Sequence, residues 1–192
     1  MALLLLISGP PGAGKTTLGT RLAQDLGLPF FSKDGIKETL FDRLGWRDRE
    51  WSRQLGAASA VLLFYCIERQ LAAGQSLVVE SAFQAAYDAP RLEALRARRA
   101  FRVLEVHCTA EIEVLLARFQ QRALTHQRHP GHGEQAQIEE LRANLIKGVY
   151  QPISTPDEVL TVDTTDVAAL EDQRLFEEIT AVLLERGGER LP

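Results

Sequence analysis

Cysteine is scarce in this chain of 192 residues and is not arranged for metal binding. The two cysteines, Cys66 and Cys108, lie in apolar surroundings and far apart in the sequence. Zinc sites need closely spaced ligands, which these residues do not provide. We therefore expect two buried free thiols in a reducing compartment.

A strong charge of one sign is also missing, because the net charge is only −4. This balance gives no general attraction to nucleic acid or to anionic lipid, so we expect neither as a partner. A local basic patch would still be enough for a nucleic-acid substrate. The arginines between Arg91 and Arg102 form such a cluster, and a solvated outer face is the other interpretation of it.

Long hydrophobic runs are absent. The apolar run at 2–7 is too short to span a membrane, and it lacks the basic flank and the cleavage site of a signal peptide. It leads directly into a glycine-rich loop, which favours a buried parallel strand. We expect a cytoplasmic protein with no membrane partner.

Internal repeats and low-complexity tracts are missing too, and the length suits one domain over 1–192. Apolar runs of strand length alternate with longer helical patterns, which predicts a three-layer α/β/α fold with a five-stranded parallel sheet. The expected strands are Ala2–Ser8, Pro29–Lys33, Ser76–Glu80, Phe101–Cys108 and Glu158–Val162. The expected helices are Gly14–Gly27, Gly35–Leu44, Arg49–Ala73, Pro90–Arg99, Glu111–Leu124, Glu134–Gly148 and Val167–Arg186.

A phosphate-binding loop follows the first expected strand. Its sequence fits the pattern G-x-x-x-x-G-K-[ST] between a strand and a helix, as the motif requires. Glycines let several backbone N–H groups face one anion, the lysine reaches the β- and γ-phosphates, and the threonine hydroxyl is a ligand for Mg²⁺. We expect ATP and Mg²⁺ here. The predicted nucleotide-binding residues are Gly9, Pro10, Pro11, Gly12, Ala13, Gly14, Lys15, Thr16 and Thr17.

Acidic residues follow the next two strands, at the edge of the sheet where ligands bind. Asp34 could cap the following helix, or it could accept the proton of a substrate hydroxyl. Lys37, one turn later, could hold an anionic substrate group or lie on a solvated helix face. Glu80 is predicted to bind substrate or to hold Mg²⁺ through water.

Arginines precede a polar loop in the second half of the chain. Arg118 and Arg122 share one helical face, and Arg128 lies in the loop. This pattern suits a lid over 118–133 whose guanidinium groups neutralise the transferred phosphoryl group, or stack on adenine. A solvated helix face is the alternative. The spacing of His129 and His132 supplies too few ligands for zinc.

The last expected strand leads into Asp163, Thr164, Thr165 and Asp166. A polar loop at this place could border the adenine, and Thr165 is the residue that we expect to contact the nucleotide. Thr165 or Asp166 could instead cap the closing helix.

Taken together, these segments resemble the small P-loop kinases related to zeta toxins, chloramphenicol phosphotransferase and polynucleotide 5′-kinase domains, and more distantly adenylate and shikimate kinases. The resemblance spans Leu3 to Asp166. It rests on GPPGAGKTT at 9–17, SKDGIKETL at 32–40, VVESAF at 78–83, ARFQQR and RHPGH within 117–132, and VDTT at 162–165.

The resemblance implies roles for these residues. Asp34 matches a substrate-activating aspartate, and Arg118 matches an arginine that stacks on adenine. Arg122 and Arg128 match the lid arginines that contact the phosphates. The expected catalytic residues are Lys15, Asp34, Arg122 and Arg128. Glu80 matches an acid that binds substrate or the water ligands of Mg²⁺. The region 34–74 matches the helical region around the acceptor. No DGFPR-like segment follows the third strand, so we do not expect a nucleoside monophosphate as acceptor.

The leading hypothesis is therefore an ATP-dependent kinase that phosphorylates a hydroxyl of an unidentified small molecule, as a monomer or a homodimer. A nucleotide-dependent regulatory module is the second. It finds little support, since the chain lacks an N/T-K-x-D motif, an LSGGQ-like signature and a hydrophobic strand ending in Asp-Glu. A polynucleotide or nucleoside kinase is the third, and the basic cluster at 91–102 is its only support.

Overall fold

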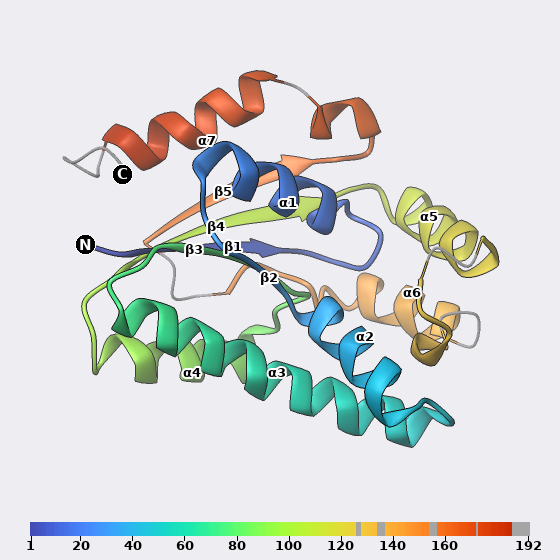
Figure 1. The fold of residues 1–192 in the computed structure, drawn as a ribbon. Helices are drawn as coiled ribbons and strands as arrows, with labels where there is room; N and C mark the ends of the chain where they lie inside the picture. Colours follow the sequence, from blue (N-terminus) through green and yellow to red (C-terminus); the bar gives the residue numbers. More distant parts are fainter. Residues whose placement is uncertain (126–127, 134–136, 154–156, 172, 186–192) are drawn as a thin grey trace.

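One parallel sheet organises the molecule (Figure 1). The computed structural model describes residues 1–125, 128–133, 137–153, 157–171 and 173–185. The strands lie in the order β2–β3–β1–β4–β5, and all neighbours are parallel. Their bounds are Leu3–Ser8 (β1), Phe30–Ser32 (β2), Leu77–Glu80 (β3), Arg102–Thr109 (β4) and Glu158–Asp163 (β5). All five expected strands are confirmed.

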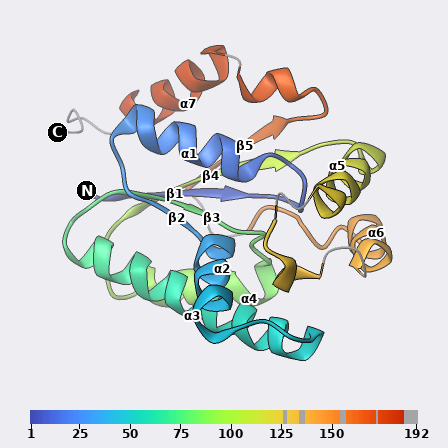
Figure 2. The ribbon, with the colours of Figure 1, turned by 45° about the vertical axis from the view of Figure 1, so that its right-hand side comes forward.

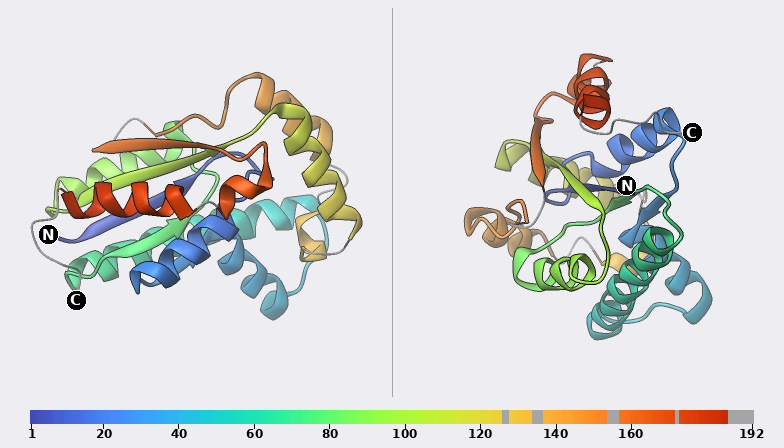
Figure 3. Two further views of the ribbon diagram at one scale, coloured as in Figure 1. Left: turned by 90° about the horizontal axis from the view of Figure 1, so that it is seen from above. Right: turned by 90° about the vertical axis from the view of Figure 1, so that its left-hand side faces the viewer.

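Helices cover both faces of the sheet. On one face lie α1 (Lys15–Leu26) and α7 (Gln173–Glu185), and on the other lie α3 (Arg49–Ala72) and α4 (Ala85–Arg96), as the end-on view in Figure 3 shows. At the carboxyl ends of the strands lie α2 (Lys33–Leu44), α5 (Ile112–Leu124), α6 (Ile138–Ile146) and the short 3₁₀ turn η1 (Pro130–His132) (Figure 2). The predicted three-layer α/β/α fold is therefore confirmed.

Strand β1 explains why two layers of helices are needed. Every residue of its sequence LLLLIS is buried, because the strand lies between β3 and β4 and has helices on both sides. Leu5 and Ile7 pack in the core beneath α1 and α7, and Leu4 and Leu6 pack in the core beneath α3 and α4. This alternation follows from the two-residue period of a strand. The central strand thus holds both halves of the fold together.

The turn after β1 requires glycine. Gly9 has a φ of 121°, and a Cβ atom at this position would lie 2.0 Å from the carbonyl oxygen of Cys108 in β4. Only a residue without a side chain fits such a close approach. Cys108 itself is fully buried, and burial raises the pKa of its thiol to about 12.

Helix α3 has the length and composition of a membrane span. Within the described part of the chain it is the one helix that meets these criteria, which many core helices of soluble proteins also meet. Its residues Leu63, Ile67 and Leu71 pack against the sheet, although Val61 and Tyr65 are exposed. The packing makes α3 part of the three-layer fold.

A buried polar cluster lies just before the phosphate loop. The Ser8 hydroxyl donates a hydrogen bond to Glu105, and Nδ1 of His107 lies 2.8 Å from the same hydroxyl. The carboxylate of Glu105 also accepts a hydrogen bond of 3.1 Å from the backbone N–H of Ile153. Burial raises the pKa of Glu105 to about 7, against the opposing effect of its hydrogen bonds. The sequence pattern did not single out this acid, because it lies inside an otherwise apolar strand.

Several helix boundaries differ from those predicted, and the differences are largest at α4 and α7. The helix expected to start at Pro90 begins at Ala85, after the N-cap residue Gln84, whose N–H donates a hydrogen bond of 2.9 Å to Asp88 inside the helix. Pro90 lies inside the helix. The closing helix is divided into a 3₁₀ turn, η3 (Val167–Leu170), and α7, and Asp166 caps the 3₁₀ turn. Residues 134–136 and 186, which the predicted helices included, lie outside the described residues.

Glu105 should make the protein less stable as the pH rises toward neutrality. Its pKa in the folded chain exceeds the ordinary 4.5, so the folded state binds this proton more tightly than the unfolded state. The contribution is fully present below pH 4.5 and is lost as the pH rises through about 7. At about 1.4 kcal/mol per pKa unit, the loss is about 3 kcal/mol.

Glu105→Gln should therefore flatten this part of the pH profile, measured by urea unfolding between pH 4.5 and 8. Glu111→Gln, at an exposed position, is the matched control and should keep the wild-type profile. An unchanged slope in Glu105→Gln would show that Glu105 does not titrate in this range.

Candidate active site

The phosphate loop presents backbone donors at the start of α1. Gly14 is the N-cap, with a φ of 75°, and no side chain caps the helix. The first N–H groups of a helix lack partners within the helix, and its dipole favours negative charge there. An uncapped N-terminus beside a lysine therefore suits the phosphates of a nucleotide.

A buried carboxylate ties this loop to the neighbouring strand ends. Glu80, at the end of β3, is only 2% exposed. It accepts hydrogen bonds from the hydroxyls of Ser32 at 2.7 Å and Thr16 at 3.3 Å. The ammonium group of Lys15 lies 3.9 Å from the same carboxylate and donates a hydrogen bond of 2.8 Å to the carbonyl of Pro10. Burial lowers the pKa of Lys15, and the charge of Glu80 opposes this effect.

This group of oxygen atoms suits Mg²⁺. The ion prefers oxygen ligands and keeps several waters, so a hydroxyl and one carboxylate beside the phosphates are sufficient protein partners. Thr16 and Glu80 provide them, and the 3.3 Å between their oxygens brings both to one place. Ser32 donates to the same carboxylate oxygen, Oε2, as Thr16 does, although the sequence pattern did not single out this residue.

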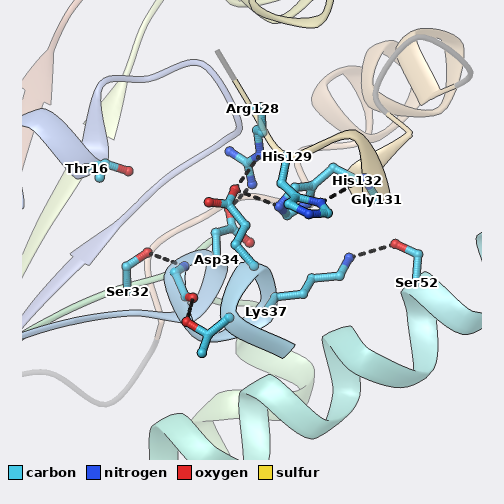
Figure 4. A network of polar contacts seen from close by, with 12 residues as sticks. Thr16, Ser32, Asp34, Lys37, Ser52, Arg128, His129, Gly131 and His132 are labelled. Atoms are coloured by element: carbon cyan, nitrogen blue, oxygen red, sulfur yellow. Dashed lines mark hydrogen bonds and ion pairs between the residues drawn. The ribbon is translucent and has the colours of Figure 1, made fainter. Parts of the chain in front are cut away.

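Asp34 lies in the first turn of α2 and binds Arg128 through an ion pair (Figure 4). The helix cap is Ser32, whose hydroxyl accepts a hydrogen bond from the N–H of Gly35, so the alternative of a capping role for Asp34 is wrong. Burial alone would raise the pKa of Asp34, but the charge of Arg128 and its hydrogen bond outweigh burial and hold the pKa well below its ordinary value. Asp34 is therefore ionised at neutral pH.

The loop at 128–133 packs against α2. The ring of His129 stacks on Phe41 with centroids 5.0 Å apart, and the edge of His132 contacts the same phenyl ring. Nε2 of His132 lies 2.9 Å from the carboxylate of Glu38, and Nε2 of His129 lies 3.3 Å from that of Asp42. Burial and the nearby Arg128 lower the pKa of His132 to about 3, so its ring is neutral. Both histidines thus connect the loop to α2.

Arg118 joins the phosphate loop to the segment after β5. Its guanidinium group donates hydrogen bonds to the carbonyls of Thr164 at 2.7 Å and Thr165 at 3.0 Å, and it lies 3.5 Å from the carbonyl of Gly12. The hydroxyl of Thr165 accepts a hydrogen bond from the N–H of Glu111. Stacking of Arg118 on adenine and contact of Thr165 with the nucleotide stay predictions.

Most of the predicted site residues line one cavity of about 470 Å³ over the phosphate loop. They are Pro11, Gly12, Gly14, Lys15, Thr16, Thr17, Asp34, Lys37, Glu80, Arg118, Arg122 and Arg128. The predicted residues Gly9, Pro10, Ala13 and Thr165 do not line it. The guanidinium group of Arg122 lies 5.6 Å from the ring centroid of Phe119. Residues from four separate segments therefore converge on one space, as the strand-end positions predicted.

A second cavity, of about 950 Å³, adjoins the first. It extends along α3 and α4, and residues such as Lys33, Lys37 and Ala82 line both spaces. Lys37 is half-buried, and its ammonium group donates a hydrogen bond of 2.9 Å to Ser52 of α3 (Figure 4). The alternative of an exposed lysine on a solvated face is therefore wrong.

The arginines of the 91–102 cluster contact separate acids. Arg96 binds Asp157 through an ion pair, and Arg98 lies 3.1 Å from Glu68. Arg91 lies 3.9 Å from Asp88. These partners divide the cluster among three places, so it does not form a single uncompensated basic surface.

Comparisons with known proteins identify the family. The AAA_33 family, described as an AAA domain, matches residues 4–147. The solved structure of a proposed kinase from Chloroflexus aurantiacus j-10-fl is 36% identical, covers 100% of this chain and 99% of its own, and has a TM-score of 0.84. The structure of a sugar kinase from Janibacter sp. HTCC2649 is 18% identical, covers 97% of this chain and 96% of its own, and shares the fold with a TM-score of 0.58.

A curated relative matches over a shorter segment. The cytidylate kinase of Aeropyrum pernix is 46% identical over 48 residues, which are 25% of this chain and 28% of that protein. The chain thus matches less than a third of the length of this relative. The family match and the full-length structural match carry the assignment. The chain belongs to the AAA_33 family and is a small P-loop kinase-like protein.

Proposed function

We propose that this P-loop kinase transfers the γ-phosphoryl group of Mg-ATP to a hydroxyl group of a small molecule. One observation carries the proposal: a nucleotide-sized cavity over the phosphate loop adjoins a larger cavity along α3 and α4. Such a pair of spaces suits a donor and an acceptor that meet at a shared boundary. We call them the donor cavity, of about 470 Å³, and the acceptor cavity, of about 950 Å³.

The donor phosphates would lie on the N–H groups at the start of α1, with Lys15 reaching the β- and γ-phosphates. Lys15 would then exchange its hydrogen bond to the carbonyl of Pro10 for the phosphates. Thr16, together with Glu80 through water, would hold Mg²⁺. When bound, Mg²⁺ neutralises charge that develops on the phosphates.

Asp34 would orient the acceptor hydroxyl. In the transfer the hydroxyl oxygen forms a bond to the γ-phosphorus, the bond from that phosphorus to the bridging oxygen breaks, and ADP leaves. The hydroxyl proton passes to Asp34 or to solvent. While Arg128 holds Asp34, the low pKa makes this carboxylate a weak base, so in that state Asp34 contributes by positioning; release of Arg128 would make it a stronger base.

The arginines would act on the transferred group. Arg128 holds Asp34 in this structure, and it lines the donor cavity together with Arg122. Movement of Arg128 from Asp34 to the γ-phosphate would release the carboxylate for the acceptor hydroxyl. The same movement would place a guanidinium group where negative charge develops, which is the function proposed for the lid.

The alternative of a regulatory ATPase makes a different prediction. It requires hydrolysis that depends on a partner protein, with no acceptor phosphorylated. The size of the acceptor cavity and its contact with the donor cavity favour transfer, because a water molecule needs no space of about 950 Å³.

A metabolite pool incubated with γ-labelled ATP tests the proposal. Label should appear in a small molecule with the wild type and should disappear with Lys15→Ala, since Lys15 is the cation at the phosphates. Lys147→Ala, at an exposed position, is the matched control and should label normally. Label in inorganic phosphate alone would contradict the proposal.

Asp34→Asn should separate binding from transfer. We expect transfer to the labelled acceptor to fall by about 100-fold or more, while ATP binding changes little. Asp48→Asn keeps a residue that can cap α3, so this control should leave both quantities unchanged. Isothermal titration and the rate of label transfer measure the two effects. Transfer at the wild-type rate in Asp34→Asn would show that the assigned role is wrong.

Phe41→Ala should release the 128–133 loop from α2. Phe41 is 1% exposed and contacts both histidines of the loop, so its removal should lower the stability of this region by about 3 kcal/mol. Limited proteolysis should then cut the loop faster than in the wild type. Leu44→Ala, at an exposed position on the same helix, should not change the rate of cleavage. Equal rates in Phe41→Ala and wild type would contradict the packing argument.

A further inference from the structure

The acceptor cavity carries an unbalanced positive charge. Five basic side chains line it, against two acidic ones. The basic residues are Lys33, Lys37, Arg49, Arg53 and Arg91, and the acidic residues are Asp88 and Glu140.

Both acids of the cavity already have arginine partners. Glu140 binds Arg49 through an ion pair, and Asp88 lies 3.9 Å from Arg91. Within the described part of the chain, Lys33, Lys37 and Arg53 have no carboxylate within 4.0 Å. Three cations without an ion pair therefore remain on the walls of the acceptor cavity, and of these Lys33 and Lys37 interact at longer range with Asp34.

The location of these cations separates their roles. Lys33 and Lys37 line both cavities, so the phosphates of ATP could attract either. Arg53 lines the acceptor cavity alone. A cation that faces only the acceptor has no function toward the donor, so its charge points to a feature of the acceptor.

Lys37 reaches the face of α3 that carries Arg53. Its ammonium group donates a hydrogen bond to Ser52 (Figure 4). A Cβ atom at Gly56, which is three residues after Arg53 and on the same helical face, would lie 3.7 Å from this ammonium group. Burial and the neighbouring charge of Lys33 lower the pKa of Lys37 to about 8. Its positive charge is thus costly in the absence of an anion, and a bound anion would stabilise it.

The wall formed by α3 leaves space next to these cations. After Ser52 and Arg53, the helix presents Gly56, Ala57 and Ala60 to the cavity. These small side chains follow the three- and four-residue spacing of one helical face. A ligand can therefore lie along α3 with one end at Arg53 and Lys37.

We propose that the acceptor carries an anionic group, a carboxylate or a phosphate ester, besides the hydroxyl that is phosphorylated, and that Arg53 and Lys37 bind this group. That the ligand is a phosphoryl acceptor rests on the proposed function. The binding of an anion by Arg53 and Lys37 does not require phosphoryl transfer. The hydroxyl would lie at the boundary of the two cavities near Asp34, and the anionic group farther along α3. The substrate class is then a hydroxylated small acid or a phosphorylated polyol.

A binding experiment with inorganic sulfate tests the anion site. The probe is sodium sulfate, compared with sodium chloride at equal ionic strength, in the presence of saturating Mg²⁺ and the non-hydrolysable analogue β,γ-imido-ATP. The analogue fills the donor cavity, so thermal-shift titration reports the remaining anion site. The wild type should show saturable stabilisation by sulfate. Arg53→Gln should weaken sulfate binding about tenfold or more, as expected for loss of a charged hydrogen bond.

Arg69→Gln is the matched control, because Arg69 is an exposed arginine of α3 that does not line the acceptor cavity. It should keep the wild-type affinity for sulfate. Equal sulfate affinity in Arg53→Gln and wild type, or no saturable binding in the wild type, overturns the proposal. If the analogue fails to bind, the proposed function is in error, and comparison of Arg53→Gln with Arg69→Gln still decides the anion site.

Transfer from γ-labelled ATP adds a second measurement with matched pairs of compounds. The pairs are D-glycerate with glycerol and D-gluconate with D-glucitol, which differ in the carboxylate. Label on an acid with little on its neutral partner supports the proposal, and Arg53→Gln should then raise KM more than it lowers kcat. Equal labelling of neutral partners overturns it. If neither compound of a pair is labelled, these compounds are not acceptors, and the sulfate titration decides the proposal.

Discussion

The buried carboxylate of Glu80 is the interaction on which the candidate site depends. A charge that is 2% exposed is costly unless it is paired and hydrogen-bonded. Lys15, Thr16 and Ser32 supply these partners from the phosphate loop and from the end of β2. Because Ser32 also caps α2, the same carboxylate fixes the start of the helix that carries Asp34. One carboxylate thus positions both the phosphate loop and the residue that we propose to orient the acceptor.

Helix α2 lines both the donor cavity and the acceptor cavity. Its first turn carries Asp34 on the donor side, and Lys37 extends to Ser52 on the acceptor side. Its middle binds the 128–133 loop through Phe41, His129 and Arg128. A ligand that displaces Arg128 from Asp34 therefore acts on a helix that both cavities share. A ligand in one cavity would in this way change the position of residues that line the other cavity.

Much of the site could be predicted from the sequence, because its parts are local. The phosphate loop is a continuous motif, and Asp34 and Glu80 follow buried strands whose parallel arrangement brings their ends together. The contacts of Lys37 with Ser52 and of Phe41 with His129 could not be predicted, since they depend on how α2 crosses α3 and on the path of a distant loop. The cation Arg53 was missed for the same reason. Its position in a charged stretch of a long helix gives no sign of the cavity that it faces.

Fold predictions failed where a local signal had two meanings. Proline is common in the first turn of a helix, so Pro90 suggested a start, but the helix begins at Ala85, and Asp88 accepts the hydrogen bond of the N-cap N–H at Gln84. Glu105 was overlooked because an acid inside an apolar strand has no periodic pattern. Its partners, Ser8 and Ile153, come from parts of the chain that the fold alone brings together.

The tight turn at Gly9 has a consequence for chemical labelling. The turn lies directly against Cys108, whose pKa is raised by burial to about 12, so the thiol is protonated at neutral pH. Thiol reagents attack the thiolate, so Cys108 is protected by burial and by its protonation. Cys66 is half-buried on α3, the helix that forms one wall of the acceptor cavity. The natural chain thus offers one favoured position for a fluorescent probe, on the helix that the acceptor is proposed to touch.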